Sequence, residues 1–287
     1  MTLLKRRERK PGYCRLAGGE GSSLKLLELG ILTLKKGERY EGETGDREMA
    51  AVILQGRCDI AGKGFSYANV GRRKTVFAGR AFTVYLPVRT AFSVACLDNC
   101  EIALCFSRTD EALQPVLVKD TDVTVGEGGV LNWRREVHSI VDERMNASKL
   151  CIGEAYNYPG NWSSWPPHKH DVSDLPHEGI MEEIYFYRYN LPQGFGFQAV
   201  YTDDRSIDEL YRVENDTAVE IPRGYHPYAG APGYYGWFLW VMAGERRGFY
   251  RRTDPNHAWI DAAEVVVKKN LYRRETRCLK PRQATTA

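Results

Sequence analysis

The sequence predicts an all-β protein that contains two similar antiparallel barrels. Three observations favour this class. Short apolar runs with strand composition are separated by Gly, Pro and Asp, amphipathic helices of ordinary length are lacking, and the second half repeats the pattern of the first. Closely spaced strands of this kind are typical of antiparallel barrels or sandwiches. A chain of 287 residues is long enough to bury a substantial core as one large or two medium domains.

Five segments of the first half read as strands. They are residues 24–34, 49–54, 81–86, 91–96 and 101–106. The first of them forms one strand or two, with Gly30 as the candidate position of a bulge. Three cysteines of the first half, Cys96, Cys100 and Cys105, are spaced like residues of a buried hairpin, and not like the paired Cys-x-x-Cys knuckles of a zinc site.

The second half continues with strands at residues 183–189 and 236–244, and residues 218–228, which contain a Pro-Arg-Gly turn, lead into the latter. Short helices are compatible with the sequence near residues 206–211 and 262–268. Residues 107–130, which are rich in Asp, Thr, Gly and Val, are expected to connect the two halves. We therefore predict an N-terminal barrel over residues 1–125 and a C-terminal barrel over residues 126–287.

One of the two halves carries a set of metal-binding residues. His168 and His170 are separated by one residue, so on a strand both side chains face the same side. Glu183 follows Glu182 at the head of a strand, and His226 comes after a Pro-Arg-Gly-Tyr turn. Imidazoles with a carboxylate suit a divalent first-row transition metal better than calcium or magnesium. The alternatives are a chance His-x-His, a solvated strand start and an ordinary turn histidine.

The first half lacks the corresponding residues. Aligning Pro87 with Pro222 places Ala91 at the position of His226. The stretch before Met49 has no histidine where His168 and His170 would fall. We therefore predict that the N-terminal barrel holds no metal and is structural, or lines an interface.

The arrangement His-x-His, Glu and His resembles the metal motifs of the cupin superfamily, which implies a duplicated cupin fold, or bicupin, built of double-stranded β-helix (jelly-roll) barrels. The distance from His170 to Glu183 is longer than usual, so residues 171–181 are expected to form an insertion loop. More specifically, several motifs resemble the 5-deoxy-glucuronate isomerases of myo-inositol breakdown, and the resemblance covers nearly the whole chain. These motifs lie at residues 27–30, 42–46, 165–171, 182–187, 193–198, 200–205, 222–227 and 241–244.

This resemblance implies a metal-dependent aldose–ketose isomerase that converts 5-deoxy-glucuronate to 2-deoxy-5-keto-gluconate. A proton leaves C2 and one arrives at C1, and a divalent metal bound by His168, His170, Glu183 and His226 polarises the carbonyl. Zinc is the first choice of metal, with manganese and iron as alternatives. The related 4-deoxy-uronate ketol isomerase, also a bicupin, shares the Glu-x-Tyr-Phe-Tyr strand, and this register favours Glu183 over Glu182 as the ligand.

Further residues are candidates for handling the substrate. Arg188 and Arg223 lie near ligands in the sequence and could pair with the C6 carboxylate, although either could be an exposed strand or turn residue. The candidates for proton transfer are Tyr185 and Tyr187, which share the face of Glu183, and also Tyr201. Gln198 is a candidate for substrate binding or proton transfer, and Glu182 is a further candidate for proton transfer.

The composition of the chain argues against nucleic acids and membranes as partners. The net charge of +3 and the scattered basic residues argue against a nucleic-acid surface. No segment is long and apolar enough for a membrane span, a secretory signal is not expected, and seven cysteines without disulfide-scaffold density favour the reducing cytoplasm. A homo-oligomer stays open. Two alternative functions remain, a metal-dependent cupin oxygenase and a non-catalytic bicupin that binds sugar acids.

Overall fold

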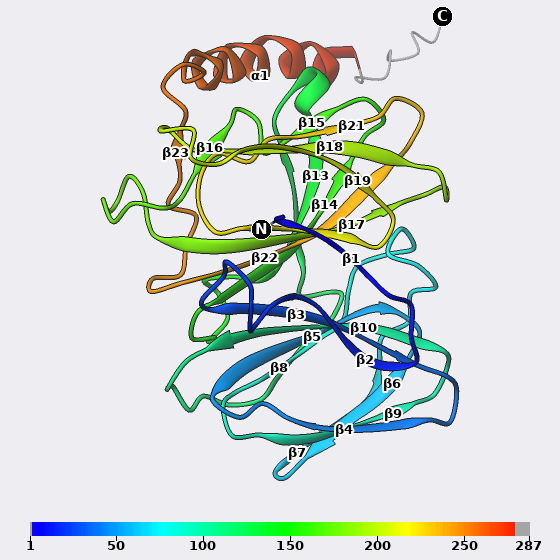
Figure 1. The fold of residues 1–287 in the computed structure, drawn as a ribbon. Coiled ribbons are helices and arrows are strands. Elements are labelled where there is room, and N and C mark those ends of the chain that lie inside the picture. The colour runs from blue at the N-terminus through cyan, green and yellow to red at the C-terminus, as the bar shows by residue number, and fades with distance from the viewer. Residues whose placement is uncertain (1, 279–287) are drawn as a thin grey trace, which may run out of the picture.

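A computed structural model describes residues 2–278 of the chain, which form two β-barrels stacked on one another with one helix at the far end (Figure 1). The strands of the lower barrel in Figure 1 are blue to green and those of the upper barrel are mostly green to orange. The predicted all-β class is confirmed, and each predicted barrel is present.

The N-terminal barrel consists of two antiparallel sheets that enclose an apolar interior. The larger sheet has six strands, in the order β11 (Val116–Val118), β8 (Thr83–Leu86), β5 (Arg47–Gln55), β10 (Cys100–Arg108), β3 (Leu27–Leu34) and β2 (Gly12–Gly18). The smaller sheet has four strands, in the order β4 (Arg39–Glu43), β9 (Ala91–Cys96), β6 (Cys58–Gly62) and β7 (Phe65–Val70).

The C-terminal barrel repeats this plan. Its larger sheet has seven strands, in the order β1 (Leu4–Arg6), β20 (Thr217–Ile221), β17 (Met181–Tyr189), β22 (Gly236–Gly244), β14 (Leu150–Asn157), β13 (Arg135–Val141) and β12 (Thr124–Gly128). The opposite wall has a four-stranded sheet and a two-stranded one, formed by β15 (Trp162–Ser163), β21 (Tyr228–Gly230), β18 (Phe195–Tyr201) and β19 (Asp208–Glu214), and by β16 (His168–Lys169) and β23 (Arg252–Thr253). A 3₁₀ turn η1 (Leu131–Trp133) and the helix α1 (Trp259–Cys278) complete the fold.

The two large sheets pack back to back, so their central strands are buried on both faces. On β17, Ile184 and Phe186 enter the core between the barrels, while Tyr185 and Tyr187 enter the interior of the C-terminal barrel. This explains why the central strands read as nearly continuous apolar runs. The alternation also fixes the register of β17, because a slip by one residue would exchange its two faces.

Equivalent strands of the two barrels pair in the same register. Met49 on β5 lies opposite Leu86 and Phe106, and Glu183 on β17 lies opposite Ile221 and Met242. The strand orders therefore make Met49 the counterpart of Glu183.

The preceding residues, Glu48 and Glu182, are also counterparts, and both carboxylates clamp the opposite barrel. Glu182 accepts hydrogen bonds from the backbone N–H groups of Lys25, Leu26 and Leu27, at 2.7, 2.8 and 3.3 Å. Glu48 accepts them from the backbone N–H groups of residues 148, 149 and 150, at 2.8, 2.6 and 2.8 Å. Each barrel thus holds the start of a central strand of the other.

Several details differ from the predictions. β1 is the edge strand of the C-terminal sheet and pairs with β20, so the chain start does not belong to the N-terminal barrel. The predicted boundary at residue 125 falls inside β12, which pairs with β13. Residues 206–211 lie largely in β19 and not in a helix, because β18 offers them a pairing partner that local propensity does not reveal. The helix predicted near residues 262–268 is present but longer, as α1.

Of the two possibilities for residues 24–34, one strand or two, the structure shows one, and the bulge expected at Gly30 lies on the neighbouring strand. Residues 27–34 form one strand, and the irregularity lies in β2, between Arg15 and Ala17, opposite Gly30 and Leu29. Gly30 is needed for another reason, since a Cβ atom there would lie 2.2 Å from the ring of Tyr13. Within residues 2–278, none of the helices combines the length and the apolar character that crossing a membrane requires.

Candidate metal centre and cavity

The four predicted metal ligands come from three parts of the C-terminal barrel and are all buried. His168 lies on β16 and His170 directly after it, Glu183 lies on β17, and His226 lies in the turn before β21. The wall formed by β16 and β23 therefore faces the strand that carries the carboxylate. The fold brings together residues that are far apart in the sequence.

Three of these side chains meet closely. The Nε2 atoms of His170 and His226 each lie 3.1 Å from Oε2 of Glu183. Their potential ligand atoms all lie within 4.8 Å of one another, and this is the one such group of three or more in the described part of the chain. The ring of His168 packs against that of His226, with centroids 4.9 Å apart. His168 is therefore adjacent to the group without belonging to the tight set.

Backbone carbonyl groups orient the histidine rings. Nδ1 of His170 donates to the carbonyl oxygen of Met181 at 2.7 Å, and Nδ1 of His226 donates to that of Gly224 at 2.9 Å. Nδ1 of His168 lies 3.1 Å from the carbonyl oxygen of Pro166. Such contacts hold the proton on Nδ1 and leave Nε2 free for a metal, as is usual for metal-binding histidines.

The residues fit a divalent transition metal. Nε2 of His226 is fully buried and has no hydrogen-bond partner of suitable geometry, which is costly unless an ion occupies the space in front of it. Ligand atoms about 2.1 Å from a metal, at angles of about 90–109°, lie about 3.0–3.4 Å apart. The observed separations of 3.1 Å agree with that spacing.

The electrostatics of His168 and Glu183 favour the forms that bind metals, whereas those of His170 favour its protonated form, which a metal would have to displace. Burial, with the nearby Arg251 guanidinium, holds the pKa of His168 well below its usual range. Burial alone would raise the pKa of Glu183, but the two adjacent histidines, His170 and His226, lower it. Burial acts against protonation of His170, yet the hydrogen bond to Glu183 raises its pKa. An ionised carboxylate beside imidazoles is the state that a metal requires.

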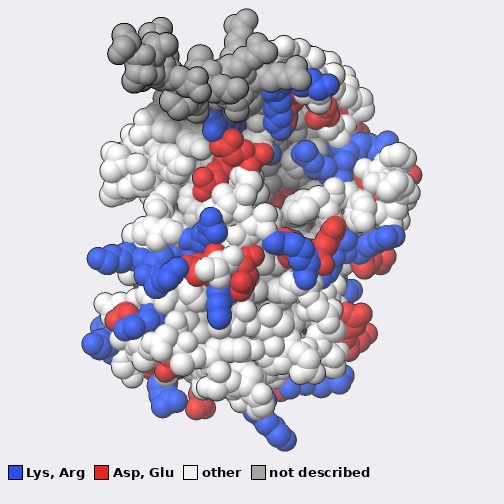
Figure 2. All heavy atoms as spheres, turned by 180° about the vertical axis from the view of Figure 1, so that it is seen from behind, with Lys and Arg blue, Asp and Glu red and all other residues white. Residues whose placement is uncertain are grey.

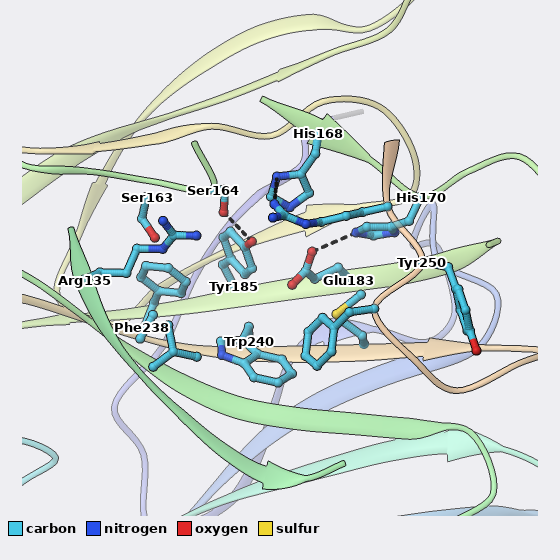
Figure 3. A pocket seen from close by; sticks show the side chains of 15 residues that line it. Arg135, Ser163, Ser164, His168, His170, Glu183, Tyr185, Phe238, Trp240 and Tyr250 are labelled. Atoms are coloured by element: carbon cyan, nitrogen blue, oxygen red, sulfur yellow. Dashed lines mark hydrogen bonds and ion pairs between the residues drawn. The ribbon is translucent and has the colours of Figure 1, made fainter. Parts of the chain in front are cut away.

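A cavity of about 280 Å³ opens beside this cluster (Figure 3). Such a volume is near the lower end of small-molecule sites, which span about 300–1,000 Å³. Its floor is aromatic, with Phe238 and Trp240 on β22, and Glu183 and His170 lie at one end of the view while Arg135 lies at the other. Tyr185 stands between these ends. The cavity can therefore accept a small molecule with polar groups at both ends.

Of the three candidate tyrosines, the structure brings Tyr185 alone to the cavity. Its hydroxyl lies 2.7 Å from Oγ of Ser164, whose backbone has a left-handed φ of 49°. Strained conformations of this kind persist where the surroundings enforce them, frequently at functional sites. The hydroxyl group of Tyr201 donates to Asp254 at 2.8 Å, outside the cavity.

Tyr187 and Gln198 lie outside the cavity and stabilise the segment that carries the metal ligand His226. The hydroxyl group of Tyr187 donates to Oε1 of Gln198. Nε2 of Gln198 donates to the carbonyl oxygens of His226 and Pro227, at 2.7 and 3.1 Å. Neither side chain lines the cavity. Gln198 therefore fixes the backbone that carries His226, and the structure does not place it against a substrate.

Neither arginine expected near the substrate carboxylate lies in the cavity. Nη2 of Arg188 lies 2.8 Å from Glu101 and 2.7 Å from Asp216, in an ion-pair cluster at the junction of the barrels. Arg223 is exposed and donates to Oγ of Ser206 at 2.9 Å. Strand parity explains the first case, because Arg188 is an odd number of residues from Glu183 and faces away from it.

The two adjacent carboxylates of β17 have separate tasks. Glu183 faces the histidines, whereas Glu182 faces the N-terminal barrel and clamps the start of β3. Glu182 therefore has no access to the cavity and is not placed to carry a proton.

The predicted insertion loop is held in place by buried charges. Glu178 is fully buried and accepts hydrogen bonds from the backbone N–H groups of Asp171 and Val172, at 2.9 and 3.0 Å. Its carboxylate also lies 3.0 Å from Nζ of Lys169 and 2.9 Å from Nε of Arg252. These contacts join β16 to β23 and fix the strand that carries His168.

The charged cavity residues that the sequence analysis did not identify are Arg135 on β13 and Arg251 just before β23. Arg135 shares the inward face with Val137, but it follows a second arginine, Arg134, and nothing local distinguishes the two. Arg251 likewise stands between Tyr250 and Arg252. Only the pairing of β13 with β14 and of β16 with β23 reveals which of these arginines reach the cavity.

Comparisons with known proteins identify the family of the chain. The profile of the KduI/IolB family matches residues 4–260. A curated protein of Geobacillus thermodenitrificans named 5-deoxy-glucuronate isomerase is 37% identical over 251 residues, which cover 87% of this chain and 92% of the relative.

Solved structures support the fold. An IolB-like protein of Salmonella typhimurium LT2 superposes with a TM-score of 0.87 at 33% identity, over 91% of this chain and 100% of that protein. An oxalate decarboxylase of Lactobacillus farciminis, in complex with formate, has a TM-score of 0.61 at 13% identity, over 96% and 94% of the two chains. The latter likeness concerns the fold alone, and the predicted bicupin architecture is confirmed.

Proposed function

The chain belongs to the KduI/IolB family, and on this premise we propose that it is a metal-dependent aldose–ketose isomerase acting on 5-deoxy-glucuronate in myo-inositol catabolism. The product is 2-deoxy-5-keto-gluconate. The observation that carries the proposal is the buried His170, Glu183 and His226 cluster beside a cavity, in a chain whose relatives bear that isomerase name over most of its length.

The ligand set of the proposal is His168, His170, Glu183 and His226. A divalent metal bound there would supply Lewis acidity to the carbonyl and hydroxyl oxygens at C1 and C2 of the substrate. Nδ1 of His170 and Nδ1 of His226 each donate to a carbonyl oxygen, so these two residues orient their Nε2 atoms toward Glu183 without rearrangement.

Tyr185 is the residue that we propose to act on the reacting oxygens. Burial, together with the charge of Glu183, raises the pKa of its hydroxyl well above the usual value. The hydroxyl therefore stays protonated near neutral pH and donates a hydrogen bond to a substrate oxygen, instead of removing the proton from C2. The contact with Ser164 aims it, and the apolar floor of Phe238 and Trp240 excludes water from the reacting carbons.

We extend the proposal to the metal and the setting of the enzyme. Zinc is the metal that we propose, with manganese and iron as the alternatives that metal analysis separates. The six described cysteines are unpaired, which supports a location in the reducing cytoplasm. Basic and acidic side chains are interspersed over the face seen in Figure 2, which therefore lacks the concentrated basic surface that binds nucleic acids, and we propose a small sugar acid as the partner.

Turnover of 5-deoxy-glucuronate by the purified protein tests the proposal. We expect isomerisation that chelation abolishes and that zinc or manganese restores, also without oxygen. Retention of activity without oxygen and with a redox-inert metal excludes the oxygenase alternative, which needs an oxidant. A protein that binds stoichiometric metal but does not turn the substrate over under any of these conditions contradicts the isomerase and leaves a sugar-acid-binding bicupin.

A further inference from the structure

Two arginines reach the cavity without a carboxylate partner. Arg135 enters from β13 and Arg251 from the segment before β23. Among the described side chains, those of residues 2–270, no ion pair of either guanidinium group is found within 4.0 Å, although ion pairs are frequent elsewhere in the molecule. Arg135 has one hydrogen bond, from Nη1 to the carbonyl oxygen of Trp133 at 3.3 Å.

The acidic residue that acts on Arg135 from α1 is already engaged. Glu264 accepts a hydrogen bond from Nε1 of Trp133 at 3.2 Å and pairs with Lys268. Burial, and next the charge of Arg251, lower the pKa of Arg135 to about 10. The guanidinium group of Arg135 therefore stays charged at neutral pH and is repelled by that of Arg251. A pair of this kind lining a cavity is stabilised by an anion that binds between them.

The contact of Arg251 with His168 also indicates that Arg251 is available to bind an anion. Nη1 of Arg251 lies 3.0 Å from Nδ1 of His168, and the carbonyl oxygen of Pro166 lies 3.1 Å from that same nitrogen. The two contacts exclude each other, because Nδ1 either accepts from the guanidinium group or donates to the carbonyl oxygen. If Nε2 of His168 binds a metal, Nδ1 carries the proton and donates to Pro166, which frees Arg251 for a ligand.

We propose that Arg135 and Arg251 form the subsite for the C6 carboxylate of the substrate, an assignment that rests on the proposed isomerase function. Arg135 and the metal ligands His170 and Glu183 lie at opposite ends of the cavity, with Tyr185 between them (Figure 3). An open-chain sugar acid then lies along the aromatic floor, with its aldehyde at the metal and its carboxylate at Arg135. Arg251 reaches that carboxylate once it leaves Nδ1 of His168, which it contacts at 3.0 Å. The arrangement selects uronates over neutral aldoses.

Binding of two open-chain probes to the metal-loaded protein tests this subsite directly. The probes are gluconate and its uncharged counterpart glucitol, with affinities measured by calorimetry. We expect the wild-type protein to bind gluconate at least about tenfold more tightly than glucitol. In Arg135→Ala and in Arg251→Ala, gluconate affinity should fall by roughly 30-fold or more, since a buried charge–charge contact is lost. Glucitol affinity should stay unchanged.

Matched variants control for folding and for loss of charge. Arg223→Ala removes an exposed arginine that donates to Ser206 and should leave both affinities unchanged. Arg135→Lys keeps the charge without the two-pronged geometry and should recover part of the gluconate affinity, whereas Arg135→Gln should not. Metal content should equal that of the wild type in every variant. If Arg135→Ala does not fold, Arg251→Ala and Arg135→Lys carry the test.

Gluconate affinity that is unchanged in both Arg135→Ala and Arg251→Ala overturns the subsite, and shows that the carboxylate binds elsewhere, for instance at the metal. Turnover separates this failure from failure of the proposed function. Active wild-type enzyme whose kcat/KM for 5-deoxy-glucuronate is unaffected by either substitution leaves the isomerase standing without the subsite. Inactive wild-type protein that still loses its preference for gluconate in the variants leaves the subsite standing without the isomerase.

Discussion

The two barrels share their strand order and register, yet one interior is an apolar core and the other holds a metal centre. At the position where the C-terminal barrel has Glu183, the N-terminal barrel has the fully buried Met49. The N-terminal interior is filled by side chains such as Ile53, Val94 and Leu104, and the C-terminal one is lined by tyrosines and histidines around a cavity. The same arrangement of strands can therefore enclose either an apolar core or a metal centre with a cavity.

The two barrels have the same carboxylate clamps between them, although their interiors differ. Glu48 and Glu182 are counterparts, and each accepts three backbone N–H groups from the other barrel. The N-terminal barrel also buries Ile184 and Phe186 on the back of the strand that carries Glu183. We infer that the barrel without a metal set supports the metal centre, because it holds β17 in register.

The largest effect is expected at the residue that distinguishes the barrels. Glu183→Gln should abolish both metal retention and isomerase activity, because an amide is a poor ligand between two imidazoles. Glu182→Gln, one residue away on the opposite face, should retain about one metal ion per chain. Metal analysis after gel filtration measures both. The reverse ranking would show that the register of β17 is off by one residue.

Removing a histidine should have a similarly large effect. His170→Ala should lose metal and activity but stay folded, since the barrel core does not depend on that ring. Circular dichroism and metal analysis report on the two properties. Stoichiometric metal in this variant, or a second metal bound within residues 1–110, would contradict a single centre confined to the C-terminal barrel.

Exchanging the two counterparts tests whether the interiors are interchangeable. Met49→Glu places a carboxylate in an apolar core without partners and should lower the free energy of unfolding by about 2–5 kcal/mol. Glu183→Met should remove the metal and cost the metal-free protein little stability, since it fills the space with apolar atoms. Urea unfolding of the metal-free proteins compares them. Equal destabilisation in both variants would refute the contrast between the two interiors.

Substitution of the clamp residues Glu48 and Glu182 should have the smallest effects, and both substitutions should affect stability and not metal binding. Glu48→Gln and Glu182→Gln should each lower the free energy of unfolding by about 1–3 kcal/mol without loss of metal. The effect should be greater for Glu48, which is fully buried and also accepts from the hydroxyl of Tyr85 at 2.7 Å. Thermal unfolding measures the difference. Metal loss in either variant would contradict a purely supporting role.

Much of the fold and of the metal set follows from the sequence alone. Alternation along a strand determines that Glu183 and Tyr185 share a face, and that His168 and His170 can both point inward. Apolar runs between turn residues identified the central strands β5, β9, β10, β17 and β22 close to their observed bounds. Local patterns suffice for these features, because the period of a strand is encoded in adjacent residues.

Only the tertiary structure decided which charged residues meet the cavity. Arg135 and Arg251 enter it, while Arg188 joins Glu101 and Asp216 between the barrels. The crossing of β1 to the C-terminal sheet was likewise decided by pairing over more than 200 positions of sequence. The local sequence around an arginine does not indicate whether its side chain faces a carboxylate, a neighbouring barrel or a cavity. Its partner is set by strand pairing between distant segments, which the local pattern does not encode.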